Sequence, residues 1–373
     1  MTSTVPRLPP ELEDCRVLMV ARQGHITETE QMCRLRARGL DVRAVVEPDS
    51  RNLSLLEEWG VPVSTMRLRS HVDLRAIRIL RRRIRKEGLT ILHALANRPL
   101  SNLLWASLGL PVKVVGYRGA VGHVHRFDPG CWVKWYHPRL DRIVCVSEAV
   151  RQDLLRSGIR PEKLVTIFKG HDLDWYRDLA RPDLPALGIP GSAFVVGCAA
   201  NMRRVKGVDV LIRALAHIPD ALDVHLLLIG EVRDPLVRRL AADPRWSQRV
   251  HLVGFRRDAV ALLGACHVAC APSRGREGLT RAIIEAMAQG VPVVVTRAGG
   301  LPEMVEDGLS GFIVDVDDAA MLADRIVRLT KDPELRQRMG RAARLRQQTM
   351  FHVDTTVDRT LALYKDLLAN TRG

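Results

Sequence analysis

The chain contains 373 residues, a length that predicts two domains because one domain usually spans about 100 to 200 residues. Its composition, 47% hydrophobic and 27% charged, lies in the globular range and excludes a wholly disordered protein. The formal charge of +15 indicates an anionic partner, such as a nucleic acid, a membrane surface or a phosphorylated substrate. Arginine supplies almost all of the positive charge, 49 residues against 8 lysines, so codon composition is an equally good explanation for part of it.

Seven cysteines are present, an odd number with irregular spacing and no CxxC pair. This pattern predicts reduced, buried thiols of a cytoplasmic protein, not a disulfide framework or a zinc site. No apolar run approaches the roughly 18 to 20 residues that cross a bilayer, and the N-terminal residues lack the pattern of a signal peptide. We expect a cytoplasmic protein that is soluble or attached peripherally to the inner face of the plasma membrane.

Short apolar runs alternate with longer stretches of helical periodicity, which predicts βαβ units and parallel sheets. The runs lie at residues 17–20, 40–46, 90–92, 112–115 and 143–146, and then at 194–198, 224–229, 250–253, 268–270 and 291–295. A polar stretch with three prolines between Asp172 and Pro190 interrupts the pattern, so we place a domain boundary near residue 180. The expected architecture is α/β, with two facing doubly wound, Rossmann-like domains over 1–180 and 181–373. Apolar residues at helical spacing near the end predict a packed amphipathic helix over 354–368.

The most informative segment covers residues 271–292. An apolar strand ends at its start, a loop with two glycines follows, and a helix is expected from about Thr280 to a C-terminal cap at Gly290. Free backbone amides at the start of such a helix favour a bound anion. Glu277 in the loop and Glu285 in the helix can both point into one cleft and hold hydroxyl-rich groups such as ribose and a hexose. Taken alone, this spacing is more typical of ordinary surface glutamates.

The run EAMAQGVPV and the following TRAGGLPE change that interpretation, because they closely resemble the nucleotide-sugar half of family 4 glycosyltransferases of the GT-B fold. Further matches follow in the order of that family. The matching segments are 146–167, 201–211, 228–230, 271–292 and 296–303. The resemblance covers roughly residues 90 to 370 and is most specific from 197 to 315. It implies a retaining, metal-independent enzyme of the bacterial envelope-polysaccharide type. It also implies an acceptor-binding domain over 1–180, a nucleotide-sugar-binding domain over 181–373, and a C-terminal helix that packs back towards the N-terminal domain.

The resemblance implies roles for individual residues. Arg203 and Lys206 correspond to basic residues that hold the donor diphosphate, where fixed positive charge favours the transition state as the leaving group gains charge. Asn201 stands where the family usually has arginine, so that role passes to Arg203 or Arg204, of which we favour Arg203. Glu285 is expected to bind the ribose hydroxyls, and Glu277 to contact the transferred sugar near the reacting carbon. The other expected donor-binding residues are Gly24, Gly230, Phe255, Arg256, Gly278, Leu279 and Thr280.

The acceptor side matches the family less well. The Gly-Gly loop after the first strand is reduced to one glycine, and Arg118 occupies the position of a common histidine. Arg118 cannot act as a base near neutral pH, because its pKa exceeds about 12. His123, which we count among the catalytic candidates, and His125 could orient or deprotonate an acceptor hydroxyl. His93 and the loop 169–172 are weaker candidates, and in retaining members a phosphate oxygen of the donor can accept the proton instead.

Residues 67–88 contain nine basic residues and two acidic ones. Leu74, Ile77, Leu80 and Ile84 fall at helical spacing among them and predict a basic amphipathic helix. Such a helix can lie on an anionic leaflet, and its apolar stripe can equally pack on the N-terminal sheet. Residues 1–175 hold 29 basic and 19 acidic residues, or +10 of the charge, so the excess belongs to the predicted acceptor domain.

The sequence therefore predicts a glycosyltransferase that uses a nucleoside-diphosphate sugar, UDP-sugar first and GDP-sugar second. The acceptor is expected to be a hydroxyl of a glycan or lipid-linked molecule in lipopolysaccharide or other envelope polysaccharide synthesis. We expect neither a cofactor nor a metal. A sugar-nucleotide epimerase or a soluble sugar-phosphate synthase on the same fold is the first alternative. A nucleic-acid-binding protein fits the charge, but the 4% aromatic content and the lack of a recognition motif argue against a nucleic acid partner.

Overall fold

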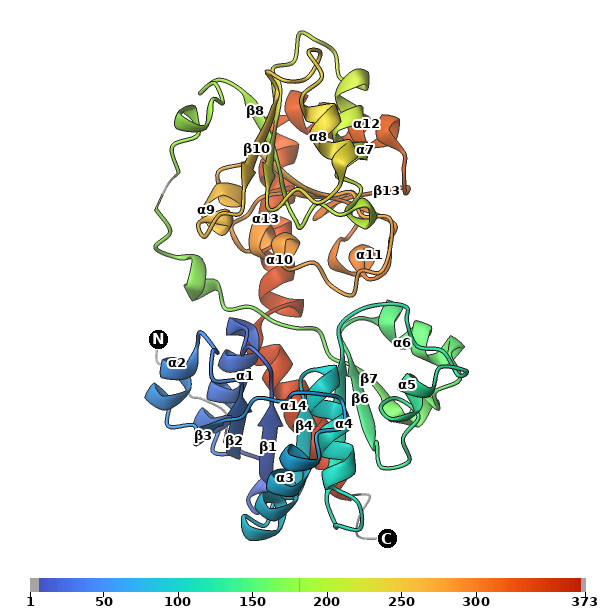
Figure 1. Cartoon of the computed structure of the whole chain (residues 1–373). Coiled ribbons are helices and arrows are strands. Elements are labelled where there is room, and N and C mark those ends of the chain that lie inside the picture. The colour runs from blue at the N-terminus through green and yellow to red at the C-terminus, as the bar shows by residue number, and fades with distance from the viewer. Residues whose placement is uncertain (1–6, 181, 370–373) are drawn as a thin grey trace. The chain divides into compact units, whose positions relative to one another are not determined.

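The computed structural model describes residues 7–180 and 182–369. They form two compact units. The first runs to Gly170 and includes the segment from Val353 onwards, and the second is His171–His352. Figure 1 shows that each unit has its own sheet, and every pairing between strands is parallel. This confirms the prediction of two doubly wound, Rossmann-like domains.

The first unit contains a seven-stranded sheet in the order β3-β2-β1-β4-β5-β6-β7. The central strands are buried, as expected for parallel strands that helices cover. The strands are β1 Arg16–Val20, β2 Asp41–Val46, β3 Val63–Thr65, β4 Ile91–Ala94, β5 Lys113–Arg118, β6 Arg142–Cys145 and β7 Leu164–Thr166. The helices are α1 Ile26–Ala37, α2 Leu53–Glu58, α3 Leu74–Lys86, α4 Asn97–Ala106, α5 Pro129–Trp132, α6 Glu148–Arg156 and α14 Val353–Ala369.

The C-terminal helix α14 belongs to the core of the first unit, as predicted. Val357, Leu361 and Tyr364 are buried there together with residues of β1 and β4. The chain therefore passes between the units twice, after Gly170 and after His352. The single boundary predicted near residue 180 falls inside the second unit, in the segment that precedes its first strand.

The second unit contains a six-stranded sheet in the order β10-β9-β8-β11-β12-β13. The strands are β8 Phe194–Ala199, β9 Val224–Ile229, β10 Val250–Gly254, β11 Val268–Ala271, β12 Val293–Thr296 and β13 Gly311–Val314. The helices are α7 Val208–Ala214, α8 Pro235–Ala241, α9 Ala259–Gly264, α10 Arg281–Ala288, α11 Leu301–Met304, α12 Ala319–Lys331 and α13 Pro333–Met350. Short 3-10 turns join several of these elements. The expected helix after the Gly-containing loop is α10.

Three strands, β3, β7 and β13, are absent from the predicted apolar runs. Each has three or four residues and lies at the edge of its sheet, so its apolar run is too short to stand out in the sequence.

The basic helix α3 forms as predicted, and one residue of its predicted apolar stripe, Leu74, is exposed. Asp73 caps it by accepting a hydrogen bond from the amide of Ala76, and Ala76, Leu80 and Ile84 are buried. Leu74, expected in the buried stripe, is 65% exposed. Leu80 and Ile84 of the predicted stripe are thus buried as expected, and near the start of the helix Ala76 is buried instead of Leu74.

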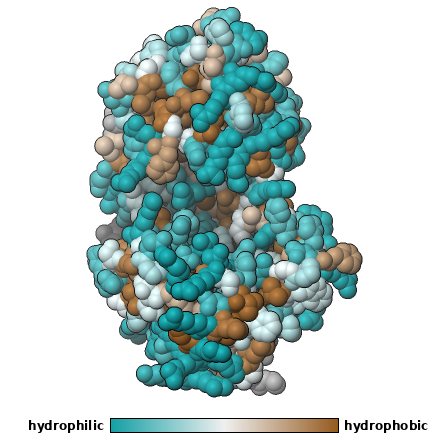
Figure 2. All heavy atoms as spheres, in the orientation of Figure 1, coloured by the Kyte–Doolittle hydropathy of each residue, from teal (hydrophilic) through white to brown (hydrophobic). Residues whose placement is uncertain are grey.

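On the face shown in Figure 2, hydrophilic residues predominate and hydrophobic ones form small patches. Across residues 7–180 and 182–369, no helix combines the length and apolar content needed to cross a bilayer.

Candidate active site

The second sheet has its topological switch point between β8 and β11. From β8 the order continues to β9 and β10, and from β11 it continues in the opposite direction to β12 and β13. Open α/β sheets bind ligands at such a point, because the loops at the carboxyl ends of the two central strands diverge there. The loop after β8 carries Arg203 and Lys206, and the loop after β11 carries Glu277.

A glycine brings these two loops into contact. Gly207 has a φ of +62°, and a Cβ atom at this position would lie 1.9 Å from the carbonyl oxygen of Pro272. Glycine tolerates both the left-handed backbone and so close an approach. The amide of Arg274 also donates to the carbonyl oxygen of Val205 at 2.8 Å. Lys206, next to the glycine, is therefore held against the β11 loop.

Glu277 is the centre of a buried polar cluster. The residue is 7% exposed, and its Oε1 accepts hydrogen bonds from Lys206 Nζ at 2.6 Å and Ser273 Oγ at 2.9 Å. Thr280 Oγ1 donates to Oε2 at 3.2 Å. These three donors fix the carboxylate in one orientation, and the ammonium of Lys206 balances its charge. The structure thus brings two of the predicted catalytic residues, Lys206 and Glu277, into direct contact.

The TRAGG segment, residues 296–300, packs against the backbone of Glu277. Gly299 has a φ of +54°, and a Cβ atom there would lie 2.2 Å from the carbonyl oxygen of Glu277. The amide of Gly300 donates to the same oxygen at 3.0 Å. The two glycines therefore let the loop after β12 pack directly on the backbone of Glu277.

Glu285 lies on α10, the helix that follows the loop with Glu277. Its side chain is 13% exposed, and its carboxylate contacts Arg281 Nε at 3.3 Å, one helical turn away. Burial raises the pKa of Glu285, and the charge of Arg281 only partly offsets this effect. In the part of the chain that the structure describes, no hydrogen bond joins Glu285 to the Glu277 cluster. A buried carboxylate with one partner on one side can still accept hydrogen bonds from sugar hydroxyls.

Residues close in sequence to Lys206 and Glu277 carry groups that can bind an anion. Arg203 is exposed, and its side chain forms no hydrogen bond or ion pair within residues 7–180 and 182–369. The amides of Gly278 and Leu279, just before α10, likewise donate no hydrogen bond to the described residues. A free guanidinium and free amides near a helix N-terminus are typical of sites that bind phosphate.

The loops after β8, β9 and β10 line a cavity of about 360 Å³. It includes Asn201, Gly254 and Phe255, and Phe255 is 74% exposed. Gly230 has a φ of +129° and closely approaches the carbonyl oxygen of Ala200 at the end of β8. Phe255 is one of the predicted donor-binding residues, and their role in binding the donor stays a prediction. The residues that line it are Asn201, Glu231, Val232, Arg238, Leu252, Gly254 and Phe255.

Arg256, another predicted donor-binding residue, is engaged elsewhere. Its Nε and Nη2 donate to the two carboxylate oxygens of Asp258 at 2.8 and 2.7 Å. This exposed pair leaves the guanidinium less available to a ligand than that of Arg203.

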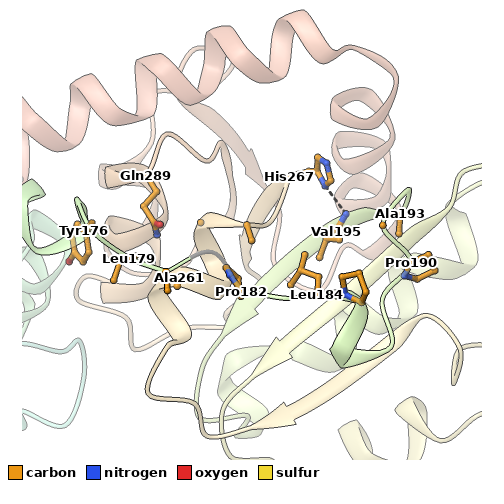
Figure 3. Close-up of a pocket in the computed structure, with 15 residues that line it drawn as sticks. Tyr176, Leu179, Pro182, Leu184, Pro190, Ala193, Val195, Ala261, His267 and Gln289 are labelled. Carbon is orange, nitrogen blue, oxygen red and sulfur yellow. Dashed lines mark hydrogen bonds between the residues drawn. The ribbon is translucent and has the colours of Figure 1, made fainter.

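A larger pocket of about 570 Å³ lies at the opposite edge of the same sheet (Figure 3). Val195 at the start of β8 lines it, and His267, just before β11, accepts a hydrogen bond from the Val195 amide at 3.0 Å. Pro182 and Pro190 line another part of the pocket. Because it lies at the amino ends of the strands, it is separate from the Lys206–Glu277 cluster.

The predicted acceptor residues lie at the carboxyl edge of the first sheet. Arg118 ends β5 and is 8% exposed; its Nη2 donates to the carbonyl oxygen of Gly122, and its guanidinium lies 5.4 Å from the ring centre of Trp135. Burial lowers the pKa of Arg118. These contacts give Arg118 a structural role in holding the loop that follows β5.

His123 and His125 lie in that loop and are exposed. His123 has a φ of +62°, a left-handed conformation that is uncommon outside glycine and asparagine. His125 lines a cavity of about 390 Å³ with residues of α6. Neither imidazole forms a hydrogen bond with another described residue, so both are accessible to a ligand. Their assignment to the acceptor stays a prediction.

His93 and Gly24 occupy more enclosed positions. His93 is 1% exposed, its Nδ1 lies 2.7 Å from the hydroxyl of Tyr364, and burial lowers its pKa to about 3. Gly24 follows β1 with a φ of +53°, and its carbonyl oxygen accepts a hydrogen bond from Asn52 at 2.6 Å. A low pKa keeps His93 neutral at physiological pH. Gly24 lies in the first unit, so its donor-binding role stays a prediction.

No three His, Cys, Asp or Glu side chains gather into an arrangement suited to a metal ion among the residues that the structure describes.

Comparisons with known proteins identify the family. The profile described as Glycosyltransferase Family 4 matches residues 29–175, and that described as Glycosyl transferases group 1 matches residues 193–332. The N-acetyl-alpha-D-glucosaminyl L-malate synthase of Bacillus anthracis is 31% identical over 257 residues, which cover 62% of this chain and 67% of that protein. The chain belongs to glycosyltransferase family 4.

Two further similarities describe this family 4 enzyme. The lipopolysaccharide core biosynthesis glycosyltransferase LpsE of Rhizobium meliloti is 34% identical over 208 residues, covering 55% of this chain and 58% of LpsE. The structure of Anabaena HepE in complex with UDP superimposes with a TM-score of 0.79 at 21% identity, covering 94% of this chain and all of HepE. The likeness to HepE establishes the GT-B fold. Alignments with the first three curated relatives span 56 to 67% of their length.

Sequence reasoning missed residues that hold the cluster together. Ser273, Gly207 and Gly299 were seen only as parts of motifs, yet they orient Glu277 or allow its loops to meet. Ser273 lies four residues before Glu277, and this spacing could have predicted their hydrogen bond, because a loop of that length can fold back on itself. The close approaches of the glycines have no such signal in a single sequence.

Proposed function

We propose that this family 4 glycosyltransferase moves a sugar from a UDP-sugar to a hydroxyl of a glycan or lipid-linked acceptor, with retention of anomeric configuration. The observation that carries the proposal is the cluster at the switch point, where Lys206 meets the buried Glu277 and the side chain of Arg203 has no partner among the described residues. HepE, a structural neighbour, was solved with UDP, which supports uracil as the base of the donor. GDP-sugar is the second choice of donor.

The charges of the cluster suit a leaving nucleoside diphosphate. Glu277 offsets the charge of Lys206, so the net positive charge is that of Arg203. The free amides of Gly278 and Leu279 add donors that need no counter-ion. As the bond between the sugar and the diphosphate breaks, the negative charge of the leaving group grows and these fixed groups stabilise it.

Glu277 is proposed to stabilise positive charge on the sugar, whereas Arg203 and Lys206 stabilise negative charge on the diphosphate. A carboxylate held by three donors cannot reorient, so its negative charge is preorganised for the positive charge that develops on the transferred sugar. In the retaining reaction the bond from the sugar C1 to the phosphate oxygen breaks, and the bond from C1 to the acceptor oxygen forms on the same face. The acceptor proton passes to the departing phosphate oxygen, so no protein base is required.

The acceptor is proposed to bind at the carboxyl edge of the first sheet, near His123 and His125. The name of LpsE supports an acceptor of the lipopolysaccharide core or another envelope polysaccharide. Both imidazoles are exposed and can donate or accept hydrogen bonds with sugar hydroxyls.

Peripheral attachment to an anionic leaflet is also proposed, through the outer face of α3. Arg81 and Arg83 of this helix are held by the protein, through the carbonyl oxygen of Ala106 and the carboxylate of Glu87. The remaining basic side chains point outward without partners among the described residues, and Leu74 and Ile79 are exposed beside them. The outward basic residues are Arg75, Arg78, Arg82, Arg85 and Lys86. Each can contribute about 1 kcal/mol near an anionic surface.

Vesicle sedimentation tests this attachment. The full chain should bind vesicles containing phosphatidylglycerol and not pure phosphatidylcholine, with binding that weakens as salt rises. Changing Arg78, Arg82 and Arg85 to glutamate should abolish binding. The same change at three exposed arginines of α13, Arg338, Arg341 and Arg344, is the control for net charge. Equal loss in both triple variants would contradict a specific role for α3.

The donor proposal is tested by calorimetry with UDP and GDP, and by a thermal-shift panel of nucleotide sugars. We expect UDP to bind more tightly than GDP, and Arg203→Gln to weaken UDP binding. Arg204→Gln is the matched control, because Arg204 is the adjacent exposed arginine. No binding of either nucleotide would refute the proposal, and loss of binding only in Arg204→Gln would move the diphosphate role to that residue.

A further inference from the structure

The β11 loop contains a basic residue, Arg274, to which the proposed donor chemistry gives no role. Its side chain is 22% exposed and lies three residues before Glu277. The Nη1 atom donates to Asp209 Oδ1 and to the carbonyl oxygen of Arg204, both at 2.7 Å. Nη2 donates to Asp209 Oδ2 at 2.7 Å, and Nε donates to Asp317 Oδ1 at 2.6 Å.

These contacts exclude Arg274 as a phosphate ligand. A guanidinium has five N–H donors, and four of them are already used within the protein. Asp209 is 2% exposed, so breaking its two-pronged contact with Arg274 to bind a ligand would leave a buried carboxylate without its main partner. Arg203, by contrast, has its guanidinium free.

The partners of Arg274 lie on both sides of the Lys206 loop. Arg204 is inside the loop, and Asp209 is the second residue of α7, just beyond Gly207. The amide of Arg274 adds a third attachment through the carbonyl oxygen of Val205. One residue of the β11 loop therefore holds the β8 loop before and after Lys206.

The contact with Asp317 extends this attachment to the loop between β13 and α12. Asp317 has a φ of +62°, a conformation that aspartate adopts more readily than most residues. The guanidinium plane thus joins three loops at the carboxyl edge of one sheet. Although burial raises the pKa of Asp209, its hydrogen bonds and ion pair with Arg274 lower that pKa overall, as expected for an ionised pair.

We propose that Arg274 is a positioning residue that sets the separation between Lys206 and Glu277, and thereby the geometry in which the donor diphosphate is held. The part of this inference that concerns the diphosphate rests on the proposed function. A loop attached at one side of Lys206 could swing, whereas attachment on both sides fixes the ammonium at 2.6 Å from the carboxylate. Lysine cannot replace Arg274, because one ammonium has three donors and no planar fork to match a carboxylate.

The test compares Arg274→Lys with Arg213→Lys in the full chain. Arg213 also contacts Asp209, at 3.9 Å, but it is half-exposed and its side chain forms no hydrogen bond with either loop among the described residues. Hydrogen–deuterium exchange is measured over residues 200–212 without ligand, and UDP affinity is measured by calorimetry below the melting temperature. We expect Arg274→Lys to speed exchange in this segment and to weaken UDP binding by roughly ten- to a hundredfold. Arg213→Lys should change neither quantity.

Asp209→Asn provides a second variant if Arg274→Lys folds poorly. It should reproduce both effects. The variant that carries both Arg274→Lys and Asp209→Asn should have the same UDP affinity as the single variant that binds UDP less tightly, because both changes break the same contact. A merely stabilising role would speed exchange throughout His171–His352 and leave UDP affinity of the folded protein unchanged.

The outcomes separate the two proposals. If the wild-type chain binds neither UDP nor GDP, the proposed function fails, and the exchange over residues 200–212 still decides whether Arg274 positions the loop. If wild-type binds UDP and Arg274→Lys matches it in affinity, or if exchange in this segment is unchanged, the positioning role of Arg274 is refuted.

Discussion

Replacing Glu277 by glutamine separates its proposed role at the transferred sugar from a role in holding the nucleotide. The substitution keeps the shape of the side chain and removes its charge. Lys206, 20% exposed and 2.6 Å from the carboxylate, then loses its counter-ion. Ser273 and Thr280 can rotate their hydroxyls and keep one hydrogen bond each to the amide.

The size of the effect follows from the burial of this ion pair. Removing one partner of a fully buried pair costs about 3 to 5 kcal/mol, whereas an exposed pair contributes about 0 to 1 kcal/mol. With side chains 9% and 20% exposed, the pair lies between these limits, and we expect a loss of about 2 kcal/mol. For a unit the size of His171–His352 this corresponds to a fall in melting temperature of about 4 to 8 °C.

The effect on UDP has the opposite sign. Glu277 competes with a diphosphate for Lys206 and repels its negative charge, so Glu277→Gln should bind UDP as tightly as wild type or up to about tenfold more tightly. Turnover should fall by about a hundredfold or more, because the preorganised negative charge is gone. Calorimetry, thermal unfolding and turnover of a UDP-sugar measure the three quantities. Glu306→Gln, at an exposed glutamate that contacts Arg346 at 3.7 Å, is the control.

A fall in UDP affinity of more than about tenfold, parallel to the loss of turnover, would refute this reasoning. Glu277 would then be a donor ligand and not a group whose charge acts on the transferred sugar.

Two further substitutions examine how the site is built. Gly207→Ala should lower both the melting temperature and UDP affinity, because the added Cβ would lie 1.9 Å from the carbonyl oxygen of Pro272 and push the loops apart. Gly158→Ala, at a left-handed glycine with nothing within 4 Å, measures the cost of the backbone conformation alone, and equal UDP affinities of the two variants would contradict the prediction. Glu285→Gln should raise the melting temperature at pH 8 and have little effect at pH 4. Burial raises the pKa of Glu285, so the protonated form stabilises the fold below the unfolded pKa and this contribution is lost as pH rises through the folded pKa. Thermal unfolding at the two pH values measures this, and an equal effect of the substitution at both would count against it. The same variant should bind UDP less well at pH 8, if the carboxylate accepts hydrogen bonds from the ribose.

The alternation of strands and helices was readable from the sequence because parallel strands buried on both faces are nearly continuous apolar runs. Val224–Ile229 is buried at every position, and this run was predicted almost to the residue. The edge strand Val63–Thr65 has an intermediate residue and two exposed ones, so it had no comparable signal. The pattern of α3 was readable, but its burial depended on which neighbours it packs against, and Leu74 was therefore misplaced.

Helix α14 likewise has features that the sequence predicts and features that only the tertiary structure shows. Its apolar periodicity predicted an amphipathic helix, and family resemblance predicted its direction of packing. Only the folded chain shows Tyr364 meeting His93 in the core at 2.7 Å, 271 residues apart in sequence. Likewise, the two places where the chain passes between units follow from this long-range packing and not from the prolines near residue 180.

The sequence by itself determined the fold class, the family, and the loops that carry Arg203, Lys206, Glu277 and Glu285. It could do so because these features are local: they consist of strand ends, glycines and short motifs whose spacing is preserved along the chain. The tertiary structure alone decided which of these charged groups are paired. Lys206 and Glu277 meet across 71 positions, and Arg274 reaches Asp209 across 65. Whether two charged side chains form an ion pair depends on the distance between them and on their burial. Both are set only when the sheet brings its loops to one edge.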